Sequence, residues 1–120
     1  MGYRKIDAGI SLDDPETGFS FRKVDGHVLL SYRDWQNDLV VIKLRNVWRF
    51  SYALFTTLPD AAAGQFCEID DSEVIAELRA DGRLGDEKLR HFLISTNEGE
   101  WCEALAEGYE MADLGELVAE

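Results

Sequence analysis

The sequence has 120 residues, of which 46% are hydrophobic and 30% charged, as in an ordinary globular domain. Its net charge of −12 argues against a nucleic-acid-binding protein, because a negative field repels phosphate backbones. No apolar run approaches the roughly 18 residues of a membrane span, and the first residues lack the apolar core of a secretory signal, so we expect one cytoplasmic domain.

The acidic charge is unevenly distributed along the chain. Residues 1–60 contain eight acidic and eight basic side chains, whereas residues 61–120 contain sixteen acidic and four basic ones. A field of this sign speeds the encounter with a basic partner. An acidic surface also simply keeps a small protein soluble, and the sequence leaves both interpretations open.

The first third of the chain predicts an arm followed by a hairpin. We expect residues 1–16 to form a loosely ordered arm or an edge strand. Residues 19–24 alternate in polarity, Asp25 and Gly26 both tolerate the positive φ of a tight hairpin turn, and residues 27–35 return as the second strand.

Residues 39–54 form the longest apolar-rich segment, which is too long for one ordinary strand. Asn46 is the residue there that best tolerates a bend, so we predict strands near 39–45 and 47–55. The second strand alternates, with one predicted inner face made of Trp48, Phe50, Tyr52 and Leu54.

After a predicted loop at 56–64 and a short strand at 65–69, a helix is expected at 71–80. Asp70 is the predicted N-cap, with Glu73 completing a capping box. The predicted buried face consists of Val74, Ile75 and Leu78.

Residues 89–96 are apolar on both faces, which is typical of a central strand. The partner strand at 101–107 carries three small residues in register (Cys102, Ala104 and Ala106), and we expect the helix at 71–80 to approach this small-residue face. Apolar residues at helical spacing near the end (Met111, Leu114, Leu117 and Val118) predict a short C-terminal helix.

Together these patterns predict a single domain over residues 1–120. We expect an α+β fold that is mostly antiparallel β, with about six or seven strands in a sandwich or strongly bent sheet and one or two short helices.

The sequence offers little for catalysis. His91 lies in the most apolar strand, where it is either a satisfied core histidine or a general base oriented by Glu103 or Glu107 across the hairpin. No nucleophile can be assigned beside it, and no catalytic or phosphate-binding motif occurs. We therefore expect a protein that is not an enzyme.

Cofactor and metal sites are not expected either. Cys67 and Cys102 lack metal-type spacing and are predicted to be buried small hydrophobic residues. The carboxylates around Asp70 and Asp71 are explained by the helix N-terminus, whose partial positive charge favours them.

The first functional hypothesis is a non-catalytic interaction protein, of inhibitor or immunity type, that binds a basic protein partner. Its acidic surface would include Glu98, Glu100 and Glu103, with Trp101 among them. This hypothesis follows from the charge difference between the two halves, and it excludes nucleic acid and membrane as partners.

The alternative is a small-ligand-binding β domain with an aromatic pocket formed by Trp48 and Tyr52, together with Arg45 or Arg49. The same basic side chains could instead meet the acidic half of a second copy, which predicts a homodimer.

Overall fold

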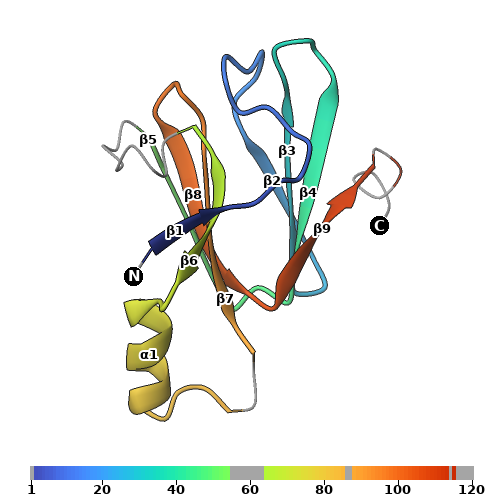
Figure 1. The fold of residues 1–120 in the computed structure, drawn as a ribbon. Helices are drawn as coiled ribbons and strands as arrows, with labels where there is room; N and C mark the ends of the chain where they lie inside the picture. Colours follow the sequence, from blue (N-terminus) through green and yellow to red (C-terminus); the bar gives the residue numbers. More distant parts are fainter. Residues whose placement is uncertain (1, 55–63, 86–87, 114, 116–120) are drawn as a thin grey trace.

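A computed structural model describes residues 2–54, 64–85, 88–113 and 115 and shows two antiparallel sheets packed face to face, with one helix beside them (Figure 1). The five-stranded sheet has the order β1 (Gly2–Lys5), β6 (Phe66–Asp70), β7 (Arg90–Ser95), β8 (Glu100–Ala106) and β5 (Arg49–Leu54). The four-stranded sheet has the order β2 (Ser20–Val24), β3 (His27–Arg33), β4 (Leu39–Arg45) and β9 (Gly108–Ala112). The helix is α1 (Glu73–Ala80). The predicted fold class is confirmed, with slightly more strands than expected.

The turn residues act as the sequence predicts. Asp25 and Gly26 have φ values of 49° and 82° and close the β2–β3 hairpin. Asn46 has a φ of 51° and ends β4, after which the chain crosses to the other sheet as β5. The β8–β9 connection crosses between the sheets beside it, where the Asn46 amide donates a hydrogen bond to Glu107.

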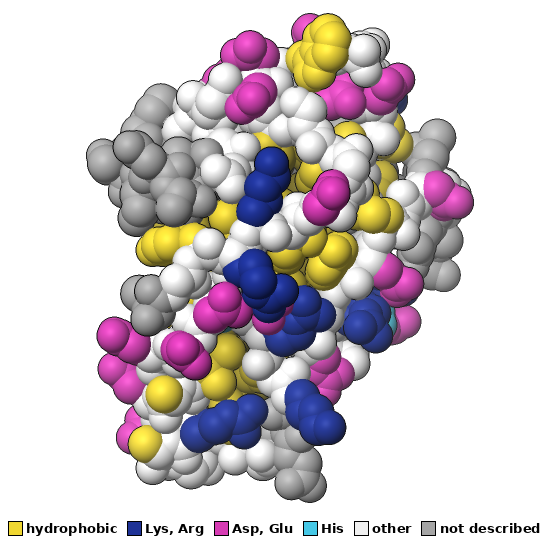
Figure 2. All heavy atoms as spheres, viewed as in Figure 1, with side chains coloured by type: hydrophobic (Ala, Val, Ile, Leu, Met, Phe, Trp, Pro, Cys, Tyr) yellow, Lys and Arg dark blue, Asp and Glu magenta, His cyan; other side chains and the backbone are white. Residues whose placement is uncertain are grey.

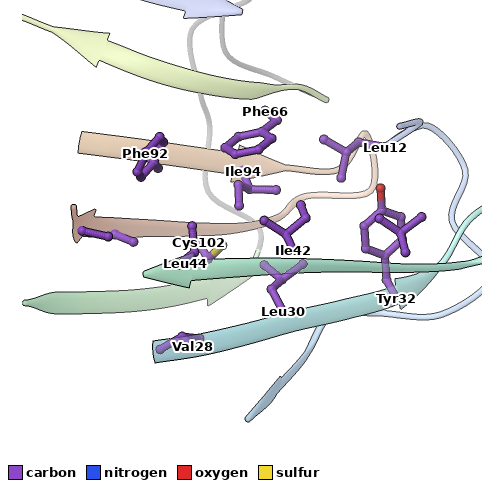
Figure 3. Packing of buried hydrophobic residues seen from close by; sticks show 13 residues of the cluster. Leu12, Val28, Leu30, Tyr32, Ile42, Leu44, Phe66, Phe92, Ile94 and Cys102 are labelled. Atoms are coloured by element: carbon purple, nitrogen blue, oxygen red, sulfur yellow. The ribbon is translucent and has the colours of Figure 1, made fainter. Parts of the chain in front are cut away.

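The main core lies between the two sheets (Figure 3). Leu30, Ile42 and Leu44 from one sheet meet Phe92 and Ile94 from the other, and all five side chains are at most 1% exposed. Burial of such side chains stabilises the fold by roughly 1.5–3 kcal/mol each.

The predicted packing of the small residues on β8 was wrong. Cys102, Ala104 and Ala106 belong to the main core, so this face of β8 packs against the four-stranded sheet and not against the helix. Both cysteines are nevertheless buried, as expected, at 0% and 1% exposure.

Helix α1 packs on the opposite, outer face of the five-stranded sheet. Leu78 is buried against Leu89, which directly precedes β7, and against Leu105 of β8. Val74 and Ile75 pack alongside. The predicted N-cap was wrong: β6 continues through Asp70, Asp71 turns the chain with a φ of 52°, and Ser72 caps the helix.

The N-terminal arm is ordered, and the edge-strand alternative holds for β1, which pairs with β6. Beyond β1 the arm packs along the main core, where Leu12 is buried and the Tyr32 hydroxyl donates a hydrogen bond to the Ser11 carbonyl oxygen at 2.8 Å.

The predicted C-terminal helix was wrong over residues 109–112, which belong to β9 and pair with β4. The reason is that the backbone groups of β4 on this side would otherwise have no strand partner. The remaining residues of the predicted helix at 114 and 116–120, and the predicted loop at 56–63, lie outside the described residues.

No helix in the described part of the chain has the length and apolar character needed to cross a membrane.

Candidate functional site

The three carboxylates predicted to form one acidic surface lie in three different environments. Glu98 is exposed at the β7–β8 turn, Glu100 is buried at 8% exposure, and Glu103 is half-buried on the outer face of β8. Trp101 is also half-buried, where its ring packs with Tyr3 on the outer face of the five-stranded sheet. The structure therefore does not bring the predicted set together.

Glu100 instead joins the two sheets. It accepts hydrogen bonds from the Tyr52 hydroxyl and, at 2.9 Å, from the backbone N–H of Phe19, which leads into β2. The hydrogen bond to Glu100 is the main reason that the pKa of Tyr52 is raised to about 12. Gly18 is the neighbour that allows this approach, because a Cβ there would lie 3.0 Å from a Glu100 oxygen.

The residues predicted to form an aromatic pocket lie along the edge of a sheet, where other side chains cover them only in part. Phe50 packs against the main core, whereas Trp48 and Tyr52 are 39% and 41% exposed. The reason is that β5 is an edge strand, which the facing edge strand β2 covers through the ring of Phe21 against Phe50 and Tyr52.

Arg45 and Arg49 lie on different sheets. The Arg45 guanidinium lies over Gly108, where a Cβ would collide with it. Arg49 lies 3.9 Å from Glu103 across the β5–β8 pair.

Exposed carboxylates gather at one end of the sandwich, which we call the acidic loop end. It consists of the exposed residues Asp13, Asp14, Glu16, Asp38 and Glu98, together with the half-buried Asp34. Its three segments are tied together by hydrogen bonds: the Asp14 N–H donates to the Asn97 side chain at 2.8 Å, and the Glu16 N–H donates to the Arg33 carbonyl oxygen at 2.9 Å. Figure 1 shows the β3–β4 turn and the N-terminal arm at this end, and Figure 2 shows acidic side chains gathered there.

The acidic loop end has an exposed aromatic residue and little positive charge. Trp35 at the β3–β4 turn is 56% exposed, the largest value among the exposed large hydrophobic residues of the described chain. Arg33 is the one basic residue within the described segments 13–17, 33–38 and 96–99. By contrast, acidic and basic residues alternate at the end of α1 and just after it, as Glu77, Arg79, Asp81 and Arg83.

A second group of polar side chains surrounds His91, which is 3% exposed. The Ser72 hydroxyl oxygen lies 2.7 Å from His91 Nδ1, and His91 Nε2 lies 3.3 Å from a Glu103 oxygen. The second contact is an electrostatic one, since Nε2 has no well-aligned hydrogen bond. Of the two partners predicted for His91, the structure therefore places Glu103, not Glu107, beside it.

The contact with His91 lowers the pKa of the Glu103 carboxylate. The adjacent His91 is the largest cause that lowers the pKa of Glu103. Together with a smaller attraction from Arg49, it outweighs the effect of partial burial, which raises the pKa.

Ser72 and His91 open onto a surface cavity of about 400 Å³, which we call the α1 cavity. It lies between the start of α1 and the ends of β6 and β7, and its lining residues are Glu68, Ile69, Asp70, Asp71, Ser72, Ile75, Ala76, Arg79, Leu89, Arg90 and His91. A smaller cavity of about 160 Å³ lies under the N-terminal arm. Neither cavity is lined by Trp48, Tyr52, Arg45 or Arg49.

An ion cluster forms one wall of the α1 cavity. Glu68 accepts two hydrogen bonds from the Arg90 guanidinium, at 2.6 and 3.0 Å, and lies 3.0 Å from Arg4. The Arg90 hydrogen bond is the largest cause that lowers the pKa of Glu68, with a further contribution from Arg4.

Among the described residues, no three His, Cys, Asp or Glu side chains are arranged to hold a metal ion. Burial raises the pKa of both cysteine thiols, which disfavours thiolate chemistry at either position.

Two features were not predicted from the sequence: the contact of Ser72 with His91, and the acidic loop end. The sequence had already indicated Glu103 as one of two possible partners of His91. Ser72 is 19 residues from His91 in sequence, and no local pattern signals their contact.

Comparisons with protein-family models, curated proteins and solved structures found no match.

Proposed function

We propose that this chain is an interaction protein of inhibitor or immunity type, and that it binds a basic protein partner through the acidic loop end. The observation that carries the proposal is the exposed Trp35 within a surface of six carboxylates and one arginine. A tryptophan is the residue type most often found as an energetic anchor in protein interfaces. Surrounding carboxylates would steer a basic partner towards it and speed association.

The acidic loop end supports this proposal better than α1 does. Its segments are held by hydrogen bonds to Asn97 in the β7–β8 turn and to Arg33 at the end of β3, so little ordering is needed on binding. Such anchoring is typical of turns at the end of a sandwich, where function is often located.

The alternative proposal of an aromatic ligand pocket receives less support. The Tyr52 hydroxyl is engaged by Glu100, and Arg45 and Arg49 lie on separate sheets.

The proposal is tested with two charge-reversal variants that change the net charge equally. One carries Glu16→Lys and Glu98→Lys on the acidic loop end, and the control carries Glu77→Lys and Asp81→Lys on α1. Each protein is immobilised and exposed to an extract of its own host, and the proteins retained are compared at low and high salt. We expect a partner that binds the wild type and the α1 control, is released by salt, and is not retained by the loop-end variant or by Trp35→Ala.

Retention of the same partner by the loop-end variant would contradict the proposal. Equal loss in both charge variants would also contradict it, because that result would reflect net charge and not a defined surface.

A further inference from the structure

The side chains of Ser72, His91 and Glu103 come from three elements: Ser72 and His91 line the α1 cavity, and Glu103 contacts His91 from the neighbouring strand. Helix α1 lies at the opposite end of the molecule from the β3–β4 turn (Figure 1). Ser72 precedes α1, His91 lies on β7, and Glu103 lies on β8. The order hydroxyl, imidazole, carboxylate is the one that hydrolases use to activate a serine.

The hydrogen bonds around Ser72 define the direction of its proton. The Ile75 N–H donates to the Ser72 oxygen at 3.3 Å, so this oxygen already acts as an acceptor. Its own hydrogen can then point to His91 Nδ1 at 2.7 Å, which requires an imidazole protonated at Nε2. That Nε2 faces Glu103 at 3.3 Å, so the negative carboxylate favours this tautomer.

We propose that Ser72 is a nucleophile activated by His91 and that this site cleaves small uncharged carboxylic esters entering the α1 cavity. The inference goes beyond the proposed interaction function. It departs from the expectation of a non-catalytic protein because no nucleophile could be assigned to His91 from the sequence, and the structure places the Ser72 hydroxyl beside it. Glu103 is a positioning residue that acts through His91.

The reaction follows from the geometry. The Ser72 oxygen attacks the carbonyl carbon while its proton passes to His91 Nδ1, and the resulting oxyanion lies near the start of α1. The first amide N–H groups of a helix, here those of Glu73 and Val74, have no partners within the helix and can donate to such an anion. The bond to the alkoxy oxygen then breaks, and the leaving alcohol takes the proton from Nδ1.

Water completes the cycle. It attacks the acyl-serine carbonyl carbon while one of its protons passes to His91 Nδ1. The serine ester bond breaks, the Ser72 oxygen takes that proton, and the carboxylic acid leaves. One ester and one water thus yield one acid and one alcohol, with no redox step.

The lining of the cavity indicates the substrate class. Ile69, Ile75 and Leu89 provide apolar surface for a short acyl group. The charged lining residues are nearly balanced, with three carboxylates and two guanidinium groups, and Glu68 is paired with Arg90. This balance favours an uncharged ester over an anionic one.

The same contacts also serve a structural role, because Ser72 caps α1 and joins it to the sheet. A covalent label separates the two roles, since a serine that acts only as a helix cap does not react with a fluorophosphonate. The full chain is incubated with a fluorophosphonate probe, and the adduct is located by peptide mass spectrometry. Hydrolysis of p-nitrophenyl acetate is measured in parallel.

We expect one adduct at Ser72 in the wild type. His91→Gln should lower both labelling and hydrolysis roughly 100-fold or more, the usual contribution of a general base. Glu103→Gln should lower kcat with little change in KM. Ser31→Ala is the matched control, because Ser31 is buried to the same 7% exposure on the other sheet and should leave both rates unchanged.

An unlabelled wild-type chain, an adduct at another residue, or labelling that His91→Gln leaves unchanged would each overturn the proposal. The wild-type result does not depend on any variant folding. Ser72→Asn retains a residue that caps helices well and should remain folded but unlabelled.

Discussion

At the scale of single residues, two buried carboxylates hold parts of the fold together. Glu100 links β8 to β5 through Tyr52 and to the start of β2 through Phe19. Glu68 links β6 to β7 through Arg90 and to β1 through Arg4. Neither set of contacts was predicted from the sequence, because the partners are distant along the chain.

The link between Glu100 and Tyr52 predicts measurable coupling. Glu100→Gln replaces a charged acceptor with a neutral one and should lower the free energy of unfolding by about 1–2 kcal/mol. Tyr52→Phe should cost a similar amount, because it removes a donor from a buried carboxylate. A double-mutant cycle measured by urea unfolding should give a coupling energy of about 1 kcal/mol. Strictly additive effects would show that the two groups do not interact in solution.

The Glu68 cluster predicts a pH dependence. Because the pKa of Glu68 is lowered in the folded state, its contribution is present above the ordinary glutamate pKa of about 4.3 and is lost as the pH falls through the lowered value. Glu68→Gln should therefore destabilise the protein by about 1–2 kcal/mol at pH 7. The difference from the wild type should shrink as the pH falls below about 4. Glu77→Gln, on the exposed face of α1, is the control and should change stability by less than about 0.5 kcal/mol at either pH. A difference that persists unchanged in acid would contradict the assignment.

At the scale of elements, a small apolar cluster joins α1 to the five-stranded sheet. The buried residue Leu78 of α1 belongs to this cluster with Leu89 and Leu105, separate from the main core. Leu78→Ala should lower the free energy of unfolding by about 2–4 kcal/mol. Amide hydrogen exchange should show that the variant opens α1 while β7 remains protected. Equal loss of protection in α1 and β7 would show that the helix is not a separate unit.

The sequence predicted the elements better than their packing. Alternation and turn residues gave the hairpins and the division at Asn46, because these depend on neighbours in sequence. They did not indicate what covers each face. The small residues of β8 fit another sheet as well as a helix, and the spacing of Met111 with later apolar residues did not reveal that β4 lacked a partner strand.

For the candidate sites too, contacts within one element or hairpin could be predicted from the sequence, whereas contacts between distant elements could not. Asp34 and Trp35 were predicted to end the strand at 27–35, whereas β3 ends at Arg33 and both residues lie in the turn with Asp38. Their proximity to Glu16 and Glu98 depends on how the two sheets align.

The contact of His91 with Glu103 follows from the hairpin register. His91 is opposite Leu105 and Glu103 is opposite Leu93, so the two are diagonal neighbours on the same face. The contact with Ser72 arises only after α1 folds back over the sheet.

At the scale of the whole molecule, the charge difference between the two halves of the sequence does not correspond to two differently charged surfaces of the folded protein. The acidic loop end draws five of its six carboxylates from residues 1–60, the half in which acidic and basic residues balance. Several acidic residues of the half 61–120 make contacts within the protein, among them Glu68, Glu100 and Glu103. A binding surface inferred from charge along the chain therefore differs from the one that the fold assembles.

Native mass spectrometry of the protein purified gently from its own host tests the central claim most directly. The account predicts a second polypeptide bound at a fixed ratio, basic in composition and released as the salt concentration rises. Bare chain or homo-oligomers alone, at every salt concentration, would contradict the claim that the acidic loop end binds a basic partner.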